Sequence, residues 1–365
     1  MAHRKKYDRK IGGRGIIKYN KKYYLWQKIK NLMLDRSFIY FLAVNLLSIS
    51  LCAQKNFTIL NDLNYGKVNC FKTEVMYSGD QDLSALMKSL ISYNYSNMPS
   101  NHDLTLDLYL PTSNKKMPLL ILAHDGAFQV GYKSDPFMVY LGENLASKEI
   151  IVASVNYGLG FIVSNAKAKE TIHKSAQSLR AAVRYLLESP YGRYIDVNSI
   201  YIGGASAGGI ASMYAAFVDD GEFEKFYRDK VAGQAFFECM DCGINKNKTK
   251  FQIKGVISMW GAIHRLDVLD NNNISVLMFH GDKDETVPYD YDYPFSKLGF
   301  QHKSSGRLIF DKLYGSKKIK ENLGNSSELI TFYGEGHSPQ YIKNSSNFNS
   351  QNCSKILSKI YSFIN

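Results

Sequence analysis

The sequence has few prolines, no second close pair of cysteines and no HExxH pattern, and these absences exclude several classes of protein. Eight prolines and 27 glycines in 365 residues exclude a collagen-like or proline-rich scaffold. Without a second cysteine pair or a histidine-rich spacing, no zinc or other metal site is expected. After residue 53 no apolar run is long enough to cross a bilayer. A hydrophobic content of 45% excludes wholesale disorder.

Acidic residues are scarce only at the start of the chain. The formal net charge is +12, but residues 1–36 hold twelve Lys and Arg against two Asp. From Gln54 onward 33 basic side chains face 31 acidic ones. The basic character therefore belongs to a leader, and the near-neutral body gives no indication of nucleic-acid binding.

The leader continues into an uncharged apolar stretch, 38–53, which reads FIYFLAVNLLSISLCA. A basic flank, an apolar run of this length and a small final residue are typical of a secretory signal peptide. We expect the signal peptide to end near Ala53 and the protein to be secreted or periplasmic. If Met33 is the true start, residues 1–32 are an upstream extension without structural meaning.

Two other interpretations of the apolar stretch remain open. It could persist as an uncleaved anchor whose basic side stays in the cytoplasm. Cys52 could instead be a lipoprotein cysteine, although Leu51 is large for the position before it. Association with a membrane is expected only through such an anchor.

Four cysteines follow the leader, namely Cys70, Cys239, Cys242 and Cys353. An exported protein meets an oxidising environment, and four cysteines allow three pairings into two disulfides. Cys239 and Cys242 could pair with each other, which would leave Cys70 to meet Cys353. A redox-active CxxC is less favoured than a structural disulfide or free thiols, because the flanking sequence does not resemble a thioredoxin unit.

Apolar runs that are rich in β-branched residues alternate with helical periodicity along the body. We expect strands at 104–110, 118–124, 150–157, 199–205, 255–261, 275–281 and 329–334, and helices at 166–188, 207–218 and 352–364. Most of the runs are continuous rather than alternating, as in strands that are buried on both faces. The sequence therefore predicts the α/β class, with a mostly parallel sheet covered by helices on both faces. Two long connections, 219–252 and 289–328, are expected to shape the substrate site.

The strongest local motif is Gly203–Gly209, GGASAGG, which contains G-x-S-x-G between a predicted strand and a predicted helix. A sharp turn of this kind projects the hydroxyl of Ser206 above the sheet, and small residues at Gly204 and Gly208 avoid collisions. A phosphate-binding loop is disfavoured, because no lysine follows the glycines.

A serine nucleophile needs a base and an acid, and both follow later predicted strands. Asp284 lies in FHGDKDETVP (279–288) and His337 in GEGHSP (334–339), so the order is Ser206, Asp284, His337. Asp282 and Glu285 are the alternative acids. His124 and His280 end strands, where a histidine more often orients a turn than reacts.

With these pieces in order, residues 100–365 resemble α/β-hydrolases of the esterase/lipase superfamily, most of all carboxylesterases of the hormone-sensitive-lipase-like type. The matching stretches are LDLYLP, LLILAHDGAF, VASVNYGLG, AAVRYLL, IDVNSIYIGGASAGG, FHGDKDETVP and GEGHSP. The resemblance implies an α/β-hydrolase fold in which Ser206 is the nucleophile, Asp284 the acid and His337 the general base. Together with the charge and hydropathy of the leader, this divides the chain into a basic leader with a signal peptide (1–53), an N-terminal segment (54–99) and a catalytic domain (100–365).

The expected oxyanion hole departs from the family pattern. His124-Asp125-Gly126-Ala127-Phe128 stands where related esterases carry H-G-G-G/A-F. Backbone N–H groups stabilise the oxyanion, and the expected donors are those of Ala207, Gly126 and Asp125. A carboxylate at Asp125 would be unfavourable there unless it is paired or points away.

The expected activity is a secreted serine hydrolase that cleaves carboxylic esters through an acyl-enzyme and uses no cofactor. The substrate is expected to be a small-molecule or saccharide ester, since the tyrosines of 289–295 could stack on a sugar or on an aromatic acyl group. Core packing is the more ordinary role for such aromatics. The alternatives are a serine peptidase of the same fold and a non-catalytic binding or adhesion domain. Nothing in the sequence determines the oligomeric state.

Overall fold

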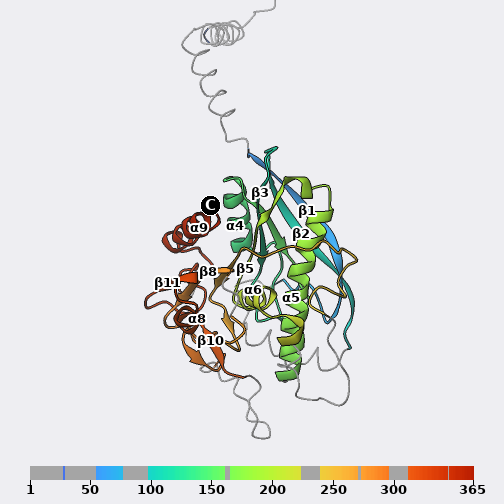
Figure 1. Cartoon of the computed structure of the whole chain (residues 1–365). Helices are drawn as coiled ribbons and strands as arrows, with labels where there is room; N and C mark the ends of the chain where they lie inside the picture. The colour runs from blue at the N-terminus through green and yellow to red at the C-terminus, as the bar shows by residue number, and fades with distance from the viewer. Residues whose placement is uncertain are drawn as a thin grey trace, which may run out of the picture. The chain divides into compact units, whose positions relative to one another are not determined.

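The computed structural model describes residues 28, 55–76, 98–160, 165–222, 239–269, 273–295, 311–343 and 345–365 (Figure 1). The expected signal peptide, anchor and lipoprotein cysteine lie outside the described residues. Within these ranges no helix is both long and apolar enough to span a membrane.

An eight-stranded sheet forms the centre of the fold, with the strand order β1-β2-β4-β3-β5-β6-β8-β11. The strands are β1 (Phe57–Cys70), β2 (Ser100–Pro111), β3 (Met117–Ala123), β4 (Ile151–Val155), β5 (Ile195–Ala205), β6 (Gly255–Met259), β8 (Ser275–Gly281) and β11 (Ser327–Phe332). β2 runs antiparallel to both β1 and β4, whereas the strands from β4 to β11 are parallel to one another. All seven strands expected from the sequence are present, and the mostly parallel sheet is confirmed.

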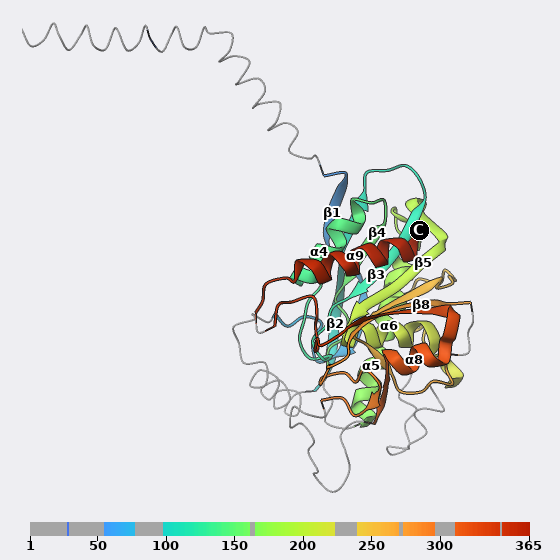
Figure 2. The ribbon, with the colours of Figure 1, turned by 90° about the vertical axis from the view of Figure 1, so that its left-hand side faces the viewer.

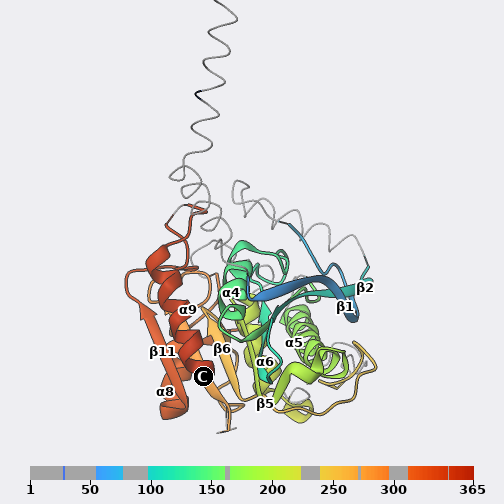
Figure 3. The same ribbon diagram turned by 90° about the horizontal axis from the view of Figure 1, so that it is seen from above.

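β1 is a strand that the sequence analysis did not anticipate, because polar residues interrupt its apolar pattern. It pairs with β2 from Phe57 opposite Pro111 to Cys70 opposite Ser100, at the edge of the sheet that is remote from β11 (Figure 3). The compact unit accordingly extends from Asn56 to Asn365. Part of the segment placed before residue 100 is therefore built into the sheet.

Helices cover both faces of the sheet, as expected. α4 (Pro136–Ala146) and α9 (Ser350–Ile364) lie on one face, and α5 (Asn165–Glu188), α6 (Ala207–Phe217) and α8 (Ser316–Leu323) on the other. Figure 2 shows α4 and α9 together on their side of the strands. In β8, Leu277 packs with the α4–α9 cluster and Met278 with the α5–α6 cluster, since successive side chains of a strand point to opposite faces.

The two long connections are only partly described. The second contains β9 (Tyr291–Asp292), β10 (Leu313–Gly315) and α8. β10 pairs with β9 and with β7 (Ala262–Ile263), which follows β6. This three-stranded sheet ties the second connection to the carboxyl end of the main sheet.

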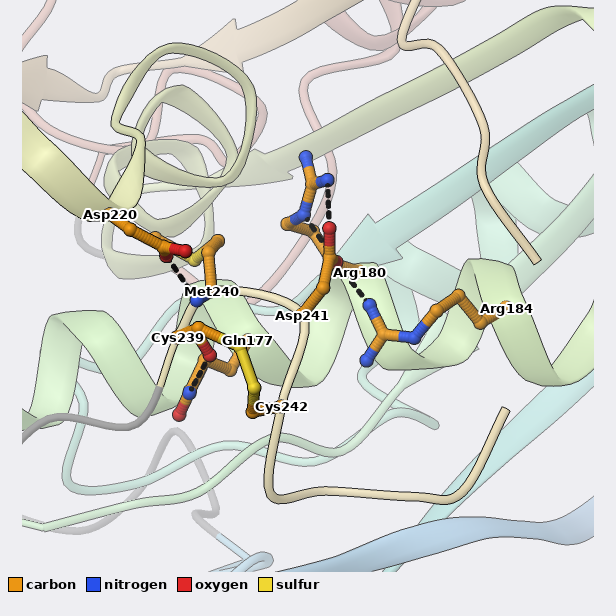
Figure 4. The surroundings of a disulfide bond; sticks show 8 residues. All are labelled: Gln177, Arg180, Arg184, Asp220, Cys239, Met240, Asp241 and Cys242. Atoms are coloured by element: carbon orange, nitrogen blue, oxygen red, sulfur yellow. Dashed lines mark hydrogen bonds and ion pairs between the residues drawn. A yellow bond between two sulfur atoms is a disulfide. The ribbon is translucent and has the colours of Figure 1, made fainter. Parts of the chain in front are cut away.

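In the first connection, Cys239 and Cys242 form a disulfide against α5 (Figure 4). The amide of Gln177 donates to the carbonyl of Cys239 at 2.8 Å. Between the two cysteines, Asp241 accepts hydrogen bonds from Arg180 at 2.8 and 2.6 Å and also pairs with Arg184. The disulfide and these ion pairs hold the end of the connection on the helix.

The other two cysteines do not form the second disulfide that the sequence allowed. Cys70 and Cys353 are both buried and free. The thiol of Cys70 hydrogen-bonds to the carbonyl of Lys72, and that of Cys353 to the carbonyl of Gln340. The two thiols belong to opposite hydrophobic clusters of the sheet, which explains why they do not meet.

Candidate active site

The carboxyl ends of β5, β8 and β11 bring Ser206, Asp284 and His337 into one hydrogen-bonded line. The hydroxyl of Ser206 lies 2.9 Å from Nε2 of His337. Nδ1 of the same ring lies 2.7 Å from Oδ2 of Asp284. Ser206 follows β5 directly, and Asp284 and His337 lie in the loops just after β8 and β11, so the parallel sheet places all three at one edge. This is the geometry that a hydroxyl, a base and an orienting acid require.

Ser206 occupies the sharp turn between β5 and α6. Its φ of 51° lies in the left-handed region, and its N–H donates to the carbonyl of Met259 at 2.8 Å. A Cβ atom at Gly208 would lie 2.2 Å from the carbonyl oxygen of Ala123, and one at Gly204 would lie 2.6 Å from the same oxygen. The two glycines thus let the first turn of α6 approach β3, as the motif predicts.

The side chain of Asp284 is fully buried, and both of its carboxylate oxygens accept hydrogen bonds. Oδ1 accepts hydrogen bonds from the N–H groups of Thr286 at 2.8 Å and Val287 at 3.0 Å. Burial alone would raise the pKa of Asp284, but the charge of His337 and the hydrogen bonds from His280 and His337 outweigh burial. The pKa of Asp284 therefore lies below its ordinary value, and the carboxylate stays ionised.

The two alternative acids are placed differently. Asp282 accepts the N–H of Gly334 at 2.6 Å and so braces the loop that carries His337. The side chain of Glu285 is exposed. Among the hydrogen bonds of the described residues, the carboxylate that reaches Nδ1 of His337 belongs to Asp284.

A second histidine, which the sequence analysis treated as a turn residue, joins the same carboxylate. His280 is fully buried at the end of β8, and its Nε2 lies 3.1 Å from Oδ2 of Asp284. Its Nδ1 lies 2.8 Å from the hydroxyl of Ser316, the first residue of α8. The sequence signal for this contact was its position four residues before Asp284, but nothing local revealed Ser316.

The loop after β3 has the tight form expected of an oxyanion loop. Gly126, Ala127 and Phe128 all have positive φ, and a Cβ at Gly126 would lie 2.0 Å from the carbonyl oxygen of Val130. No hydrogen bond among the described residues uses the N–H of Gly126. The N–H of Ala207 opens α6, where the first amides have no acceptor within the helix. The N–H groups of Gly126 and Ala207 are thus available to donate to an oxyanion at this edge of the sheet.

His124 supports this loop rather than reacting. Its ring stacks on Tyr157 with a centroid distance of 4.4 Å, and its Nδ1 lies 2.6 Å from the carbonyl oxygen of Asp125. Burial lowers the pKa of His124 to about 4, so the ring is neutral near pH 7. The hydroxyl of Tyr157 in turn donates to the carbonyl of His124 at 2.8 Å.

The carboxyl of Asp125 lies close enough to that of Asp135 to be affected by its charge. Burial, together with the charge of Asp135, raises the pKa of Asp125 to about 7, although the charge of His337 opposes the rise. Asp135 caps α4 and accepts the N–H of Phe137 at 2.9 Å. Burial also raises the pKa of Asp135. Two neighbouring carboxyl groups do not ionise together readily, so the pair gives up its second proton at a higher pH than an isolated carboxyl group would.

The tyrosines after the acid loop divide into two groups. Tyr289 has a packing role, since its hydroxyl meets that of Thr331 at 2.8 Å and its ring edge meets His280. Tyr291 is 42% exposed and stacks on Tyr314 at a centroid distance of 4.3 Å. Nζ of Lys312 lies 5.1 Å from the ring centroid of Tyr291 and 5.2 Å from that of Tyr293, so these partly exposed rings also contact a cation. Among the described residues no group of three or more His, Cys, Asp or Glu could hold a metal ion.

A family model described as BD-FAE matches residues 106–273, a range that includes the loop after β3 and Ser206 but neither Asp284 nor His337. The para-nitrobenzyl esterase of Bacillus subtilis (strain 168) is 27% identical over 223 residues, which cover 54% of this chain and 45% of that protein. Gut esterase 1 of Caenorhabditis elegans is 30% identical over 120 residues, which cover 31% of this chain and 21% of that protein. The chain therefore spans less than half the length of both relatives.

Solved structures that align with this chain include two esterases. Esterase 2 of Thermogutta terrifontis, phosphorylated by paraoxon, aligns with a TM-score of 0.47 and 16% identity over 72% of this chain and 90% of its own. A truncated carbohydrate esterase from gut microbiota aligns with a TM-score of 0.47 and 16% identity over 86% of this chain and 97% of its own.

Proposed function

Because this chain is an α/β-hydrolase whose sequence is similar to carboxylesterases, we propose that it hydrolyses carboxylic esters with Ser206 as the nucleophile. One observation carries the proposal. The hydroxyl of Ser206 lies 2.9 Å from His337, which lies 2.7 Å from the buried carboxylate of Asp284. When a hydroxyl, an imidazole and a carboxylate are hydrogen-bonded in this order, the imidazole can remove the proton of the hydroxyl and later return a proton.

In the proposed acylation step, Nε2 of His337 takes the proton of Ser206 while Oγ attacks the ester carbonyl carbon. The carbonyl oxygen becomes an oxyanion, to which the N–H groups of Ala207 and Gly126 donate. The intermediate then expels the alcohol, which receives the proton from His337, and the acyl group stays on Ser206. Throughout the step, Asp284 accepts the N–H at Nδ1 and stabilises the imidazolium.

In the proposed deacylation step, a water molecule replaces the alcohol. His337 removes a proton from the water, the hydroxide attacks the acyl carbonyl, and the second oxyanion occupies the same pair of amides. Collapse of this intermediate releases the carboxylic acid and returns the proton to Ser206. The reaction consumes one water and needs no redox cofactor.

The experiment that tests the function combines a substrate panel with covalent labelling. The purified chain is assayed on p-nitrophenyl esters of short to long acids, on a feruloyl ester, on an acetylated saccharide and on aminoacyl p-nitroanilides. A fluorophosphonate, which phosphonylates activated serines, is then applied, and the modified peptide is identified by mass spectrometry. We expect ester turnover and a single label on Ser206.

Each other outcome of this experiment contradicts the proposal in a defined way. Faster cleavage of anilides than of esters would assign the chain to the serine peptidases. If the chain shows no turnover and takes no label, the result would favour a binding or adhesion domain. Ester turnover with the label on another residue would reject Ser206 as the nucleophile.

The carboxyl of Asp125 leads to an expected pH dependence. Its pKa is raised to about 7, so the group is neutral in acid and gains a negative charge as the pH rises through that value. A negative charge beside the oxyanion opposes its formation, and kcat/KM should therefore fall above neutral pH. We expect Asp125→Asn to abolish this fall and to raise kcat/KM at about pH 9 roughly tenfold, which corresponds to about 1.4 kcal/mol.

The matched control for this prediction is Glu149→Gln, which neutralises an exposed carboxylate just before β4. The pH profile of kcat/KM is measured for both variants and for the wild type. An alkaline limb that persists unchanged in Asp125→Asn would show that Asp125 does not face the reacting centre.

We also propose that the protein is exported and that its ester substrate carries a sugar or an aromatic group. Export is supported by the basic leader, the apolar stretch 38–53 and the disulfide between Cys239 and Cys242. The substrate class is supported by the exposed stack of Tyr291 on Tyr314. Sequencing the amino terminus of the exported protein tests the first point, and the feruloyl and saccharide esters of the panel test the second.

A further inference from the structure

Two imidazole rings converge on a single carboxylate oxygen beside Ser206. Oδ2 of Asp284 lies 2.7 Å from Nδ1 of His337 and 3.1 Å from Nε2 of His280. The first ring reaches the nucleophile, whereas the second is fully buried behind the acid. His337 takes part in the proposed acylation and deacylation steps, whereas His280 has no role in them.

The contacts of His280 fix where its proton sits. Nε2 faces two acceptors, Oδ2 of Asp284 at 3.1 Å and the carbonyl oxygen of Val287 at 3.2 Å, so this nitrogen carries the hydrogen. Nδ1 then accepts the hydroxyl hydrogen of Ser316 at 2.8 Å. Ser316 is the first residue of α8 and is itself fully buried. A neutral ring with its hydrogen on Nε2 satisfies every one of these contacts.

From this arrangement we propose that His280 is a positioning residue that sets the basicity of His337 by sharing Oδ2 of Asp284. The inference rests on the proposed serine-esterase function, because basicity of His337 matters only if that ring removes a proton from Ser206. His280 does not touch the substrate and acts through the carboxylate alone.

The physical basis is competition between donors on one oxygen. A hydrogen bond from His280 draws negative charge away from Oδ2, so Asp284 stabilises the imidazolium of His337 less than a carboxylate with one donor would. The same bond, with the two backbone N–H groups on Oδ1, prevents the carboxylate from rotating. His280 thus holds the acid in place and limits how strongly Asp284 stabilises the imidazolium of His337.

Other ionisable groups of the described residues face this assembly and must be considered. The ring edge of Tyr289 meets His280 at a centroid distance of 5.6 Å, and the carboxyl of Asp125 interacts with the charge of His337. The amino end of α8 lies at Ser316, where the helix dipole disfavours a positive charge on His280. These groups are unchanged in the variants below, so differences between the variants report His280.

Two substitutions of similar size separate the role of each ring nitrogen. In His280→Gln the side-chain amide nitrogen stands close to the position of Nε2 and keeps a donor for Asp284. In His280→Asn the shorter amide reaches only the position of Nδ1, so it keeps a partner for Ser316 and loses Asp284. Both variants place an amide in the same buried site, so their effects on folding should be similar, which thermal unfolding checks.

The experiment is the pH profile of kcat/KM on a short p-nitrophenyl ester, whose acid limb reports the pKa of the general base in the free enzyme. We expect His280→Asn to move the midpoint of the acid limb upward by about 0.5–1 pH unit, with kcat about tenfold lower and KM unchanged. His280→Gln should keep the wild-type midpoint. The nitrogen chemical shifts of histidine in the wild-type protein should show His280 neutral, with its hydrogen on Nε2.

Several results would overturn the inference while leaving the function intact. One is an acid limb that moves equally in both variants or in neither, with ester turnover retained. Another is a wild-type spectrum that shows His280 with its hydrogen on Nδ1 instead of Nε2. This measurement does not depend on the folding of any variant. Wild-type protein without Ser206-dependent turnover would instead reject the proposed function.

Discussion

Ser206→Ala is expected to lower kcat on p-nitrophenyl esters by about 10⁵–10⁶-fold, which is the size of loss found when the nucleophile of a serine hydrolase is removed. The reason is local. Without Oγ no acyl-enzyme forms, and His337 has no hydroxyl to deprotonate. Alanine tolerates the backbone of the turn as well as serine does, and the hydroxyl of Ser206 does not cap α6. The measurement is steady-state kinetics beside thermal unfolding.

Ser212→Ala is the matched control for this loss. Ser212 lies on the same helix, is fully buried, and donates its hydroxyl to the carbonyl of Gly208 at 2.7 Å. Among the hydrogen bonds of the described residues, none joins Ser212 to His337, so kcat should stay within about threefold of the wild type while stability falls by about 1 kcal/mol. Wild-type turnover by Ser206→Ala would remove the basis of the proposed mechanism.

Asp284→Asn is expected to lower kcat/KM by about 10⁴-fold, the effect of replacing the acid of a Ser-His-Asp triad by its amide. An amide nitrogen near Nδ1 of His337 would donate where the carboxylate accepts. The ring would then favour the tautomer with its hydrogen on Nε2, which cannot take the proton of Ser206. Kinetics at several pH values measure the loss, which should persist across the profile.

Asp282→Asn tests whether the acid has been assigned correctly. The asparagine oxygen can still accept the N–H of Gly334, which now lies 2.6 Å from Oδ1 of Asp282. The loop of His337 should therefore keep its form, and kcat/KM should stay within about threefold of the wild type. A greater loss in Asp282→Asn than in Asp284→Asn would transfer the role of the acid to Asp282.

Much of the fold follows from features that are short in sequence. Continuous apolar runs such as 118–124 and 275–281 specify strands that are buried on both faces, and parallel strands place their following loops at one edge. Ser206 could be identified from the small residues around it, because a sharp turn between a strand and a helix tolerates few larger side chains. The expectation that Ser206, Asp284 and His337 lie together is a consequence of these two rules.

β1 and α8, two of the elements that were not expected from the sequence, have a weak or short apolar pattern. β1 carries polar residues at many positions and is specified by its pairing with β2. α8 has eight residues, of which only a few are buried. Stabilisation of such elements comes from tertiary packing rather than from local propensity, so they become visible only in the folded chain.

By itself, the sequence determined the α/β class, the order of the main strands and the three residues most suited to serine chemistry. Only the tertiary structure decided which of three neighbouring carboxylates meets His337, that the charge of Asp135 acts on Asp125, and that His280 shares the acid with His337. The physical reason is that these choices depend on distances of a few ångströms between side chains from different strands and helices. No spacing along the chain encodes such distances, because they are set by the packing of α8 against β8 and β11 and of α4 against β4.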